Sequence, residues 1–169
     1  NDLGRRVNET PLTASNFGSA TGYYGTAKDA INSAIRTLNQ EAFQWPFNFV
    51  EALETLTAGT MRYGYPATAK TIDYNSFRIK RSASFGNETI KLKVLDYDEY
   101  LSKFIDDEYN TDESIRSVPL YIVRAPGNKY IVHPSPNQAY ELVFEYYSLP
   151  VDLASHDDVP TTPDAYRHI

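Results

Sequence analysis

The chain has 169 residues, 41% hydrophobic and 22% charged, which suffices for one compact domain with or without a small subdomain. Its net charge of −6 argues against a protein that grips phosphate backbones over a broad surface. Cysteine is absent, which excludes disulfides, zinc fingers and thiolate nucleophiles, and no apolar run approaches the ~20 residues of a membrane-spanning helix, so we expect no membrane contact.

The N-terminal part predicts one long helix. Residues 2–10 are a candidate short helix, and the glycines up to Gly25 indicate a loop after it. From residue 27 to 43, Ala, Ile and Leu recur at helical spacing, behind a start at Thr26 that is similar to a capping box. Trp45-Pro46-Phe47 ends this helix, because proline has no amide hydrogen and disfavours a helical residue before it.

After the helix, the pattern is typical of short antiparallel strands. Turn residues predict three hairpins, each formed by two neighbouring strands, and a longer last strand follows. Within 89–95, Ile90, Leu92 and Val94 alternate with two lysines, which predicts one buried and one wet face. The expected strands are 52–56 with 61–65, 76–81 with 89–95, 120–124 with 130–133, and 139–147.

One short helix interrupts the strands. Asp96 followed by Glu99 is a second capping box, which predicts a helix through Ile105. The acidic run from 106 to 113 is expected to end it as a solvated loop, since runs of like charge usually stay in water.

The fold class predicted is α+β: an N-terminal helix packing with a C-terminal helix, plus an antiparallel β-sheet region with one short inserted helix. We expect a helical part with an N-terminal loop over 1–48, the β region over 49–150, and an extended connection leading into a C-terminal helix over 151–169. Pro163 and Asp164 give a helix-start signal just before the sequence stops, so we expect most of that helix to lie beyond Ile169.

Motifs that carry chemistry are weak. No phosphate-binding glycine loop is present, and the three histidines are too scattered to form a zinc site. His133, at a strand end, is interpreted as a surface or rim residue. The acidic run departs from a calcium-binding loop at Thr111 and Ser117, where glycine and glutamate are needed. We therefore expect no catalytic residue, no cofactor and no metal.

Two pairs of glutamates on predicted strands leave one enzymatic reading open. Glu51 with Glu54, or Glu141 with Glu145, could serve a glycan-cleaving enzyme, but sequence spacing does not give the separation of the carboxylates. Solvent-facing strand positions explain them better, so this reading ranks lowest.

An ordered series of segments is more informative than any single motif, and it resembles the head-to-tail adaptor proteins of short-tailed bacteriophages, of the tail tubular protein A type. The resemblance covers roughly residues 26–169. The segments are Ala42-Phe43 with Trp45-Pro46-Phe47, Ala58-Gly59-Thr60, Tyr63 to Pro66, Phe77-Arg78-Ile79, Asp96 to Tyr100, Val118 to Tyr121, His133 to Pro136, Tyr140 to Tyr147 with Leu149-Pro150, and Thr162 to His168.

The resemblance implies a structural protein of the virion neck, assembled in the host cytoplasm, and not an enzyme. Its partners would be copies of itself in a ring, expected to be a dodecamer, the portal protein, and a tail tube or nozzle protein. DNA would pass through the channel without specific binding, which an acidic protein favours. A chain rich in Tyr and Phe can supply the two different patches that a ring contact needs.

Within this reading, we expect Trp45, Phe47 and Tyr65 to support the junction between helix and sheet. Tyr109, Arg116 and Arg124 are our candidates for subunit contacts. The alternative is a carbohydrate- or receptor-binding β module of a virion, which would use exposed tyrosines and the acidic loop with a metal. Tyr140 and Tyr146 share an apolar strand face and are expected in the core instead.

Overall fold

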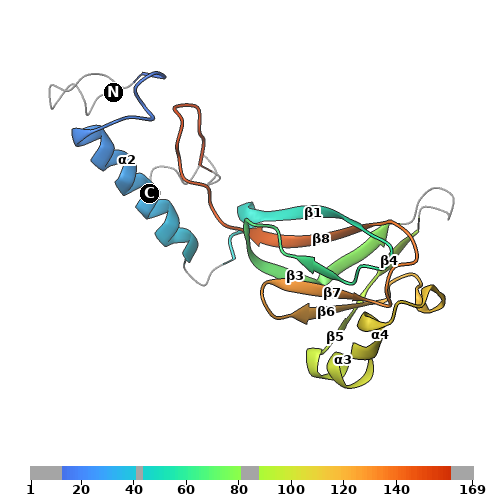
Figure 1. Ribbon diagram of the computed structural model, residues 1–169. Helices are drawn as coiled ribbons and strands as arrows, with labels where there is room; N and C mark the ends of the chain where they lie inside the picture. The colour runs from blue at the N-terminus through green and yellow to red at the C-terminus, as the bar shows by residue number, and fades with distance from the viewer. Residues whose placement is uncertain (1–12, 41–43, 81–87, 161–169) are drawn as a thin grey trace. The chain divides into compact units, whose positions relative to one another are not determined.

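A computed structural model describes residues 13–40, 44–80 and 88–160 of the chain (Figure 1). The predicted helix over 2–10, and the helix expected after residue 162, lie outside these ranges. The chain divides into two compact units, one formed by residues 1–48 and 149–169 and the other by Phe49–Ser148. We call them the helical unit and the sheet unit and describe each separately.

The helical unit contains helix α2, Gly22–Gln40. It begins earlier than predicted, because Thr26 does not cap it: the Thr26 hydroxyl donates to the Gly22 carbonyl, 3.1 Å away, inside the first turn. The buried residues of α2 are Asn32 and Asn39, whereas Ile31 and Leu38 on the apolar stripe are about half exposed. A short 3₁₀ helix, η1, Pro46–Asn48, follows.

The sheet unit contains two four-stranded sheets. Sheet A has the order β1-β8-β3-β4, and all its neighbouring strands are antiparallel. Sheet B has the order β2-β7-β6-β5, with β5 parallel to β6. The strands are β1 Phe49–Leu56, β2 Arg62–Gly64, β3 Ala69–Lys80, β4 Thr89–Lys91, β5 Lys93–Leu95, β6 Tyr121–Ala125, β7 Lys129–His133 and β8 Tyr140–Ser148.

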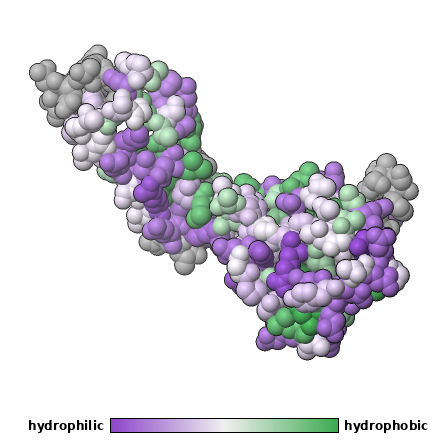
Figure 2. All heavy atoms as spheres, viewed as in Figure 1, coloured by the Kyte–Doolittle hydropathy of each residue, from purple (hydrophilic) through white to green (hydrophobic). Residues whose placement is uncertain are grey.

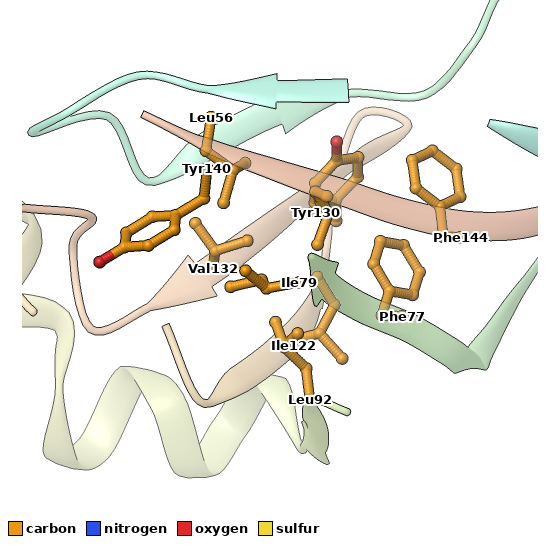
Figure 3. Close-up of a cluster of buried hydrophobic side chains, with 10 residues drawn as sticks. Leu56, Phe77, Ile79, Leu92, Ile122, Tyr130, Val132, Tyr140 and Phe144 are labelled. Carbon is orange, nitrogen blue, oxygen red and sulfur yellow. The ribbon is translucent and has the colours of Figure 1, made fainter. Parts of the chain in front are cut away.

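The main core of the sheet unit lies between the facing surfaces of the two sheets. Alternate residues of β8 enter it, as the period of two along a strand requires. Phe77 and Phe144 stack with ring centroids 4.6 Å apart, and Tyr130 meets both rings edge-on (Figure 3). Leu56, Phe77, Ile79, Leu92, Ile122, Tyr130, Val132, Tyr140, Leu142 and Phe144 make up this core.

A second, smaller core covers the opposite face of sheet B. Helices α3, Tyr97–Lys103, and α4, Ile105–Tyr109, pack there, and the 3₁₀ helix η3, Glu113–Ile115, follows them. Tyr100 is fully buried against Met61, Val123 and Ile131. Sheet B is therefore apolar on both faces, whereas among the described residues sheet A contributes to a core on its inner face only.

The α+β class is confirmed, and so are the strand pairs β3 with β4 and β6 with β7. The hairpin expected from 52–56 and 61–65 is wrong, because β1 and β2 belong to different sheets. The turn between them carries the chain from one sheet to the other, and the Gly59 amide donates to the Pro136 carbonyl, 2.9 Å away.

The stretch expected as one strand over 89–95 is two strands in two sheets. The Leu92 amide donates to Phe77 in sheet A and the Lys93 amide to Leu120 beside sheet B, both at 2.9 Å. The segment therefore crosses the edge of the sandwich at the buried Leu92.

The acidic run from 106 to 113 is only partly a loop, which corrects the sequence reading. Asp106, Asp107 and Glu108 occupy the first turn of α4, where negative charge suits the unpaired amides and the positive end of the helix dipole. Asp112 caps η3, accepting from the Ser114 amide at 2.8 Å.

Candidate interaction surfaces

The three candidates for subunit contacts lie in different surroundings. Tyr109, at the end of α4, is 76% exposed, and Arg124 is exposed on β6. Arg116 is mostly covered: its guanidinium binds Glu113 at 3.0 Å, and a Cβ on Gly59 would lie 3.3 Å from its Cζ. Tyr109 and Arg124 are therefore available on the surface, whereas Arg116 already makes intramolecular contacts.

The three candidate junction residues are divided between the two units. Trp45 and Phe47 stack in the helical unit with centroids 5.5 Å apart, and the Trp45 indole donates to Leu38 O at 3.1 Å. Tyr65 lies in the sheet unit, where it stacks on Tyr130 and its hydroxyl hydrogen-bonds that of Tyr74. Trp45 thus attaches the segment after α2 to the end of that helix.

The chain after β8 binds along α2 within the helical unit. The Asn32 side chain accepts from the Leu153 amide at 2.9 Å and donates to the Leu153 carbonyl at 3.2 Å. Arg36 forms a two-point ion pair with Asp152. Asn32 therefore completes the backbone hydrogen bonds of an extended segment, a role that its place between Ile31 and Ser33 does not indicate.

His133 is buried and is not a rim residue, which corrects the sequence interpretation. Helices α3 and α4 cover it: its ring lies 4.4 Å from that of Phe104, and its Nε2 lies 3.9 Å from an Asp107 carboxylate oxygen. Its Nδ1 has no hydrogen-bond partner among the described residues. Burial lowers the pKa of His133, and the nearby Asp107 only partly offsets this.

A polar network that the sequence does not indicate attaches α4 to sheet B. Both oxygens of Glu108 accept from Arg62 of β2, and one also accepts from the Tyr100 hydroxyl at 3.1 Å. Burial alone would raise the pKa of Glu108, but the hydrogen bonds from Arg62 and Tyr100 and the charge of Arg62 lower it. Glu108 is therefore held as a carboxylate at neutral pH.

On the outer face of sheet A, Arg78 joins three strands. Its guanidinium binds Glu51 of β1 at 2.6 Å and Glu145 of β8 at 3.0 Å. Glu51 and Glu145 each belong to one of the glutamate pairs that could serve a glycan-cleaving enzyme. Each is instead paired with arginine.

No cluster of three or more metal-ligating side chains occurs in the described ranges 13–40, 44–80 and 88–160. Among the helices of those ranges, none is long and apolar enough to cross a membrane.

Comparison with known families decides what kind of protein carries these surfaces. The sequence matches the family of the SU10 adaptor protein over residues 2–169. The chain belongs to the SU10 adaptor protein family. This confirms the resemblance to phage head-to-tail adaptors and makes the chain a phage structural adaptor. No curated protein matches the sequence.

The surface of this adaptor offers apolar groups in both units. In the helical unit, Ile31 and Leu38 lie on the exposed side of α2. In the sheet unit, the exposed apolar side chains include Leu53, Val94 and Leu120. Figure 2 shows hydrophobic residues among the polar ones over both units. A structural adaptor works by contact, so these groups are the first candidates for its interfaces.

The tyrosines of this adaptor are largely internal. Tyr140 is buried, and Tyr63, Tyr65, Tyr74 and Tyr146 pack against the main core. The prediction that Tyr140 and Tyr146 belong to the core is confirmed for Tyr140, whereas Tyr146 is partly buried and packs against that core. A broad tyrosine platform for sugars, which the binding-module alternative needs, is thus not built from these side chains.

Proposed function

We propose that this adaptor is one subunit of a closed ring in the neck of a phage virion, between the portal protein and a tail tube or nozzle protein. The ring is expected to be a dodecamer assembled in the host cytoplasm, with an axial channel through which DNA passes. The observation that carries the proposal is the family match over nearly the whole chain.

The physical character of the chain supports a ring. A ring is built from heterologous contacts, in which two different patches of each subunit meet. Both sheets of the sheet unit end in strands that are paired on one side only: β1 and β4 in sheet A, β2 and β5 in sheet B. Two different edges of one sandwich are suitable for such contacts.

The charge balance supports passage of DNA without retention. The net charge of −6 disfavours broad binding to a polyanion, because phosphate binding depends on accumulated Lys and Arg. A weakly repelling wall allows DNA to move, whereas a basic wall would retain it.

Electron microscopy and mass measurement of the purified protein, alone and mixed with its portal protein, test the proposal. We expect closed rings in at least the mixture, bound coaxially to the portal. A protein that stays monomeric in both samples, or binds the portal without forming a ring, would contradict it.

A further inference from the structure

The two outer strands of sheet A differ in a way that matters for assembly. The first, β1, pairs with β8 over eight consecutive residues with no register shift. It contains no proline, lysine or bulge, which are the usual protections of an exposed edge against pairing with another chain. Its charged residues are Glu51 and Glu54, and Leu53 is 59% exposed.

The opposite edge of the sandwich is formed by one segment, Thr89–Leu95. This segment supplies β4 at the end of sheet A and β5 at the end of sheet B. Its charged residues are Lys91 and Lys93, both exposed. Val94 is 51% exposed, and Leu120, whose carbonyl accepts from the Lys93 amide, is 46% exposed. The alternation that predicted a buried Val94 fails here, because the segment leaves the core after Leu92.

We infer that β1 of one copy pairs edge to edge with the β4–β5 segment of the next copy. This rests on the proposed ring and names the surfaces that close it. Each edge has unpaired backbone groups and an exposed apolar side chain, and their charges are opposite, with Glu51 and Glu54 on one and Lys91 and Lys93 on the other. In the register that sets Thr55 beside Thr89, Glu51 lies diagonally across from Lys91 on the outer face of sheet A, whereas Glu54 lies in the row of Ile90 on the inner face. Opposite charges on facing strands attract, and like charges repel.

The same charges select a head-to-tail contact over a symmetric one. Two β1 edges would bring glutamates together, and two β4–β5 edges would bring lysines together. Only β1 against β4–β5 matches, and this arrangement leaves one free edge of each kind on every pair of copies. Further copies can therefore add in the same sense, which is the requirement for a ring.

Strand direction also fits. Strands β1 and β3 are both antiparallel to β8, so they run the same way, and β4 is antiparallel to β3. Copies placed side by side in one orientation therefore bring β1 antiparallel to the neighbour's β4. Antiparallel pairing forms a regular ladder, so sheet A would continue from copy to copy.

Charge reversal tests the contact in full-length protein. Glu51→Lys with Glu54→Lys makes both edges basic, and Lys91→Glu with Lys93→Glu makes both acidic. We expect each variant to lose at least tenfold in assembly at a fixed concentration, and a mixture of the two, or one chain carrying all four changes, to regain it. Lys103→Glu, an exposed charge reversal on α3, is the matched control and should assemble normally.

Cysteine pairing gives a second readout that does not depend on charge. Because the chain has no cysteine, Thr55→Cys combined with Thr89→Cys introduces the only thiols. The two positions lie in matching rows on the same face of sheet A, since Thr55 pairs with Glu141, Glu141 with Lys80, and Lys80 with Thr89. On mild oxidation we expect covalent oligomers longer than dimers from the double variant and none from either single variant.

The outcomes separate this inference from the proposed function. Wild-type protein that forms no ring, alone or with portal, contradicts both. Rings formed equally by wild type and by both charge-reversed variants, with no cysteine oligomers, would overturn the edge contact alone. The edge contact would also be overturned if the charge-reversed variants still unfold cooperatively but do not assemble, and their mixture does not regain assembly.

Discussion

At the scale of single residues, the buried His133 couples the stability of the sheet unit to pH. Burial lowers its pKa below the ordinary value of 6.5, so the unfolded chain binds its proton more readily than the folded one. The stability contributed by neutral His133 is thus present above about pH 6.5 and is lost as the pH falls through that value toward the folded pKa.

The corresponding variant is His133→Phe, which keeps a ring beside Phe104. We expect the fall in melting temperature between pH 7.5 and 5.5 to be smaller in this variant than in wild type. Thermal unfolding followed by circular dichroism measures it. His156→Phe, which replaces an exposed histidine, is the control. If the melting temperature of His133→Phe falls as steeply with pH as that of wild type, the assignment is contradicted.

The Glu108 network gives a prediction in a separate pH range. Glu108→Gln removes the carboxylate that accepts from Arg62 and Tyr100, and leaves the Arg62 charge partly buried. The expected loss in the free energy of unfolding at pH 7 is about 1–3 kcal/mol, measured by urea titration. Asp106→Asn, on the same helix but exposed, should change it by less than about 0.5 kcal/mol.

Because the lowered pKa of Glu108 favours the carboxylate, its stabilisation is complete above the ordinary value of 4.5 and is lost as the pH falls through the folded value. Glu108→Gln should therefore differ from wild type at pH 7 and converge with it in acid. A constant difference down to the acid limit would show that packing, and not charge, accounts for the loss.

The burial of His133 and the pairing of Glu108 with Arg62 could not be predicted from the sequence, and the physical reason is the same for both. The surroundings of His133 and Glu108 are created by helices α3 and α4 folding back over sheet B. Periodicity predicts a helix but not the sheet face that it covers. A run of acidic residues read along the chain looks solvated, although one of its members faces an arginine from a distant strand.

At the scale of elements, the turn between β1 and β2 depends on a residue without a Cβ. Gly59 has φ +78°, and a Cβ there would press on the Arg116 guanidinium. Gly59→Ala is expected to cost about 1–2 kcal/mol of unfolding free energy, the usual penalty of the left-handed region. Gly64→Ala is the matched control, because a Cβ at that position would meet no heavy atom within 4 Å and the residue needs no such backbone conformation.

The segment after β8 gives a second prediction at this scale. Asn32→Ala removes both hydrogen bonds to the Leu153 backbone. We expect hydrogen exchange of the Leu153 amide to accelerate about tenfold, the effect of losing roughly 1.4 kcal/mol of local protection. Exchange in β3 and β8 should be unchanged. Ser33→Ala, the exposed neighbour, is the control, and equal acceleration in both variants would contradict the role of Asn32.

The elements show where sequence patterns succeed and where they fail. Alternation of apolar and polar residues correctly predicted β8, and the Pro-Gly-Asn turn correctly predicted the β6–β7 hairpin. Gly127 and Asn128 both adopt positive φ in that turn. The sequence pattern did not predict that neighbouring strands of the chain belong to different sheets. The turn at residues 57–60 resembles a hairpin turn locally, and only the burial of Leu56 and Met61 in different cores reveals a crossover.

At the scale of the whole molecule, the two units differ in what can stabilise them. The sheet unit has two apolar cores of its own. In the described part of the helical unit, no large hydrophobic side chain is buried; its buried side chains are Asn32, Asn39 and Asn48. Hydrophobic burial dominates folding, so the described part of the helical unit has little to hold it together on its own.

We therefore expect the sheet unit to carry the cooperative stability of the isolated subunit. A truncated chain of residues 44–148 should unfold in urea with the same midpoint as the full chain within about 0.3 M, since both apolar cores lie within it. Hydrogen exchange in the full chain should be fastest in α2 and slowest in β7 and β8. On ring assembly, α2 should become protected, because Ile31 and Leu38 need a partner to leave water. A truncated chain that unfolds at a much lower midpoint, or an α2 as protected as β8 before assembly, would show that the helical unit already stabilises the subunit.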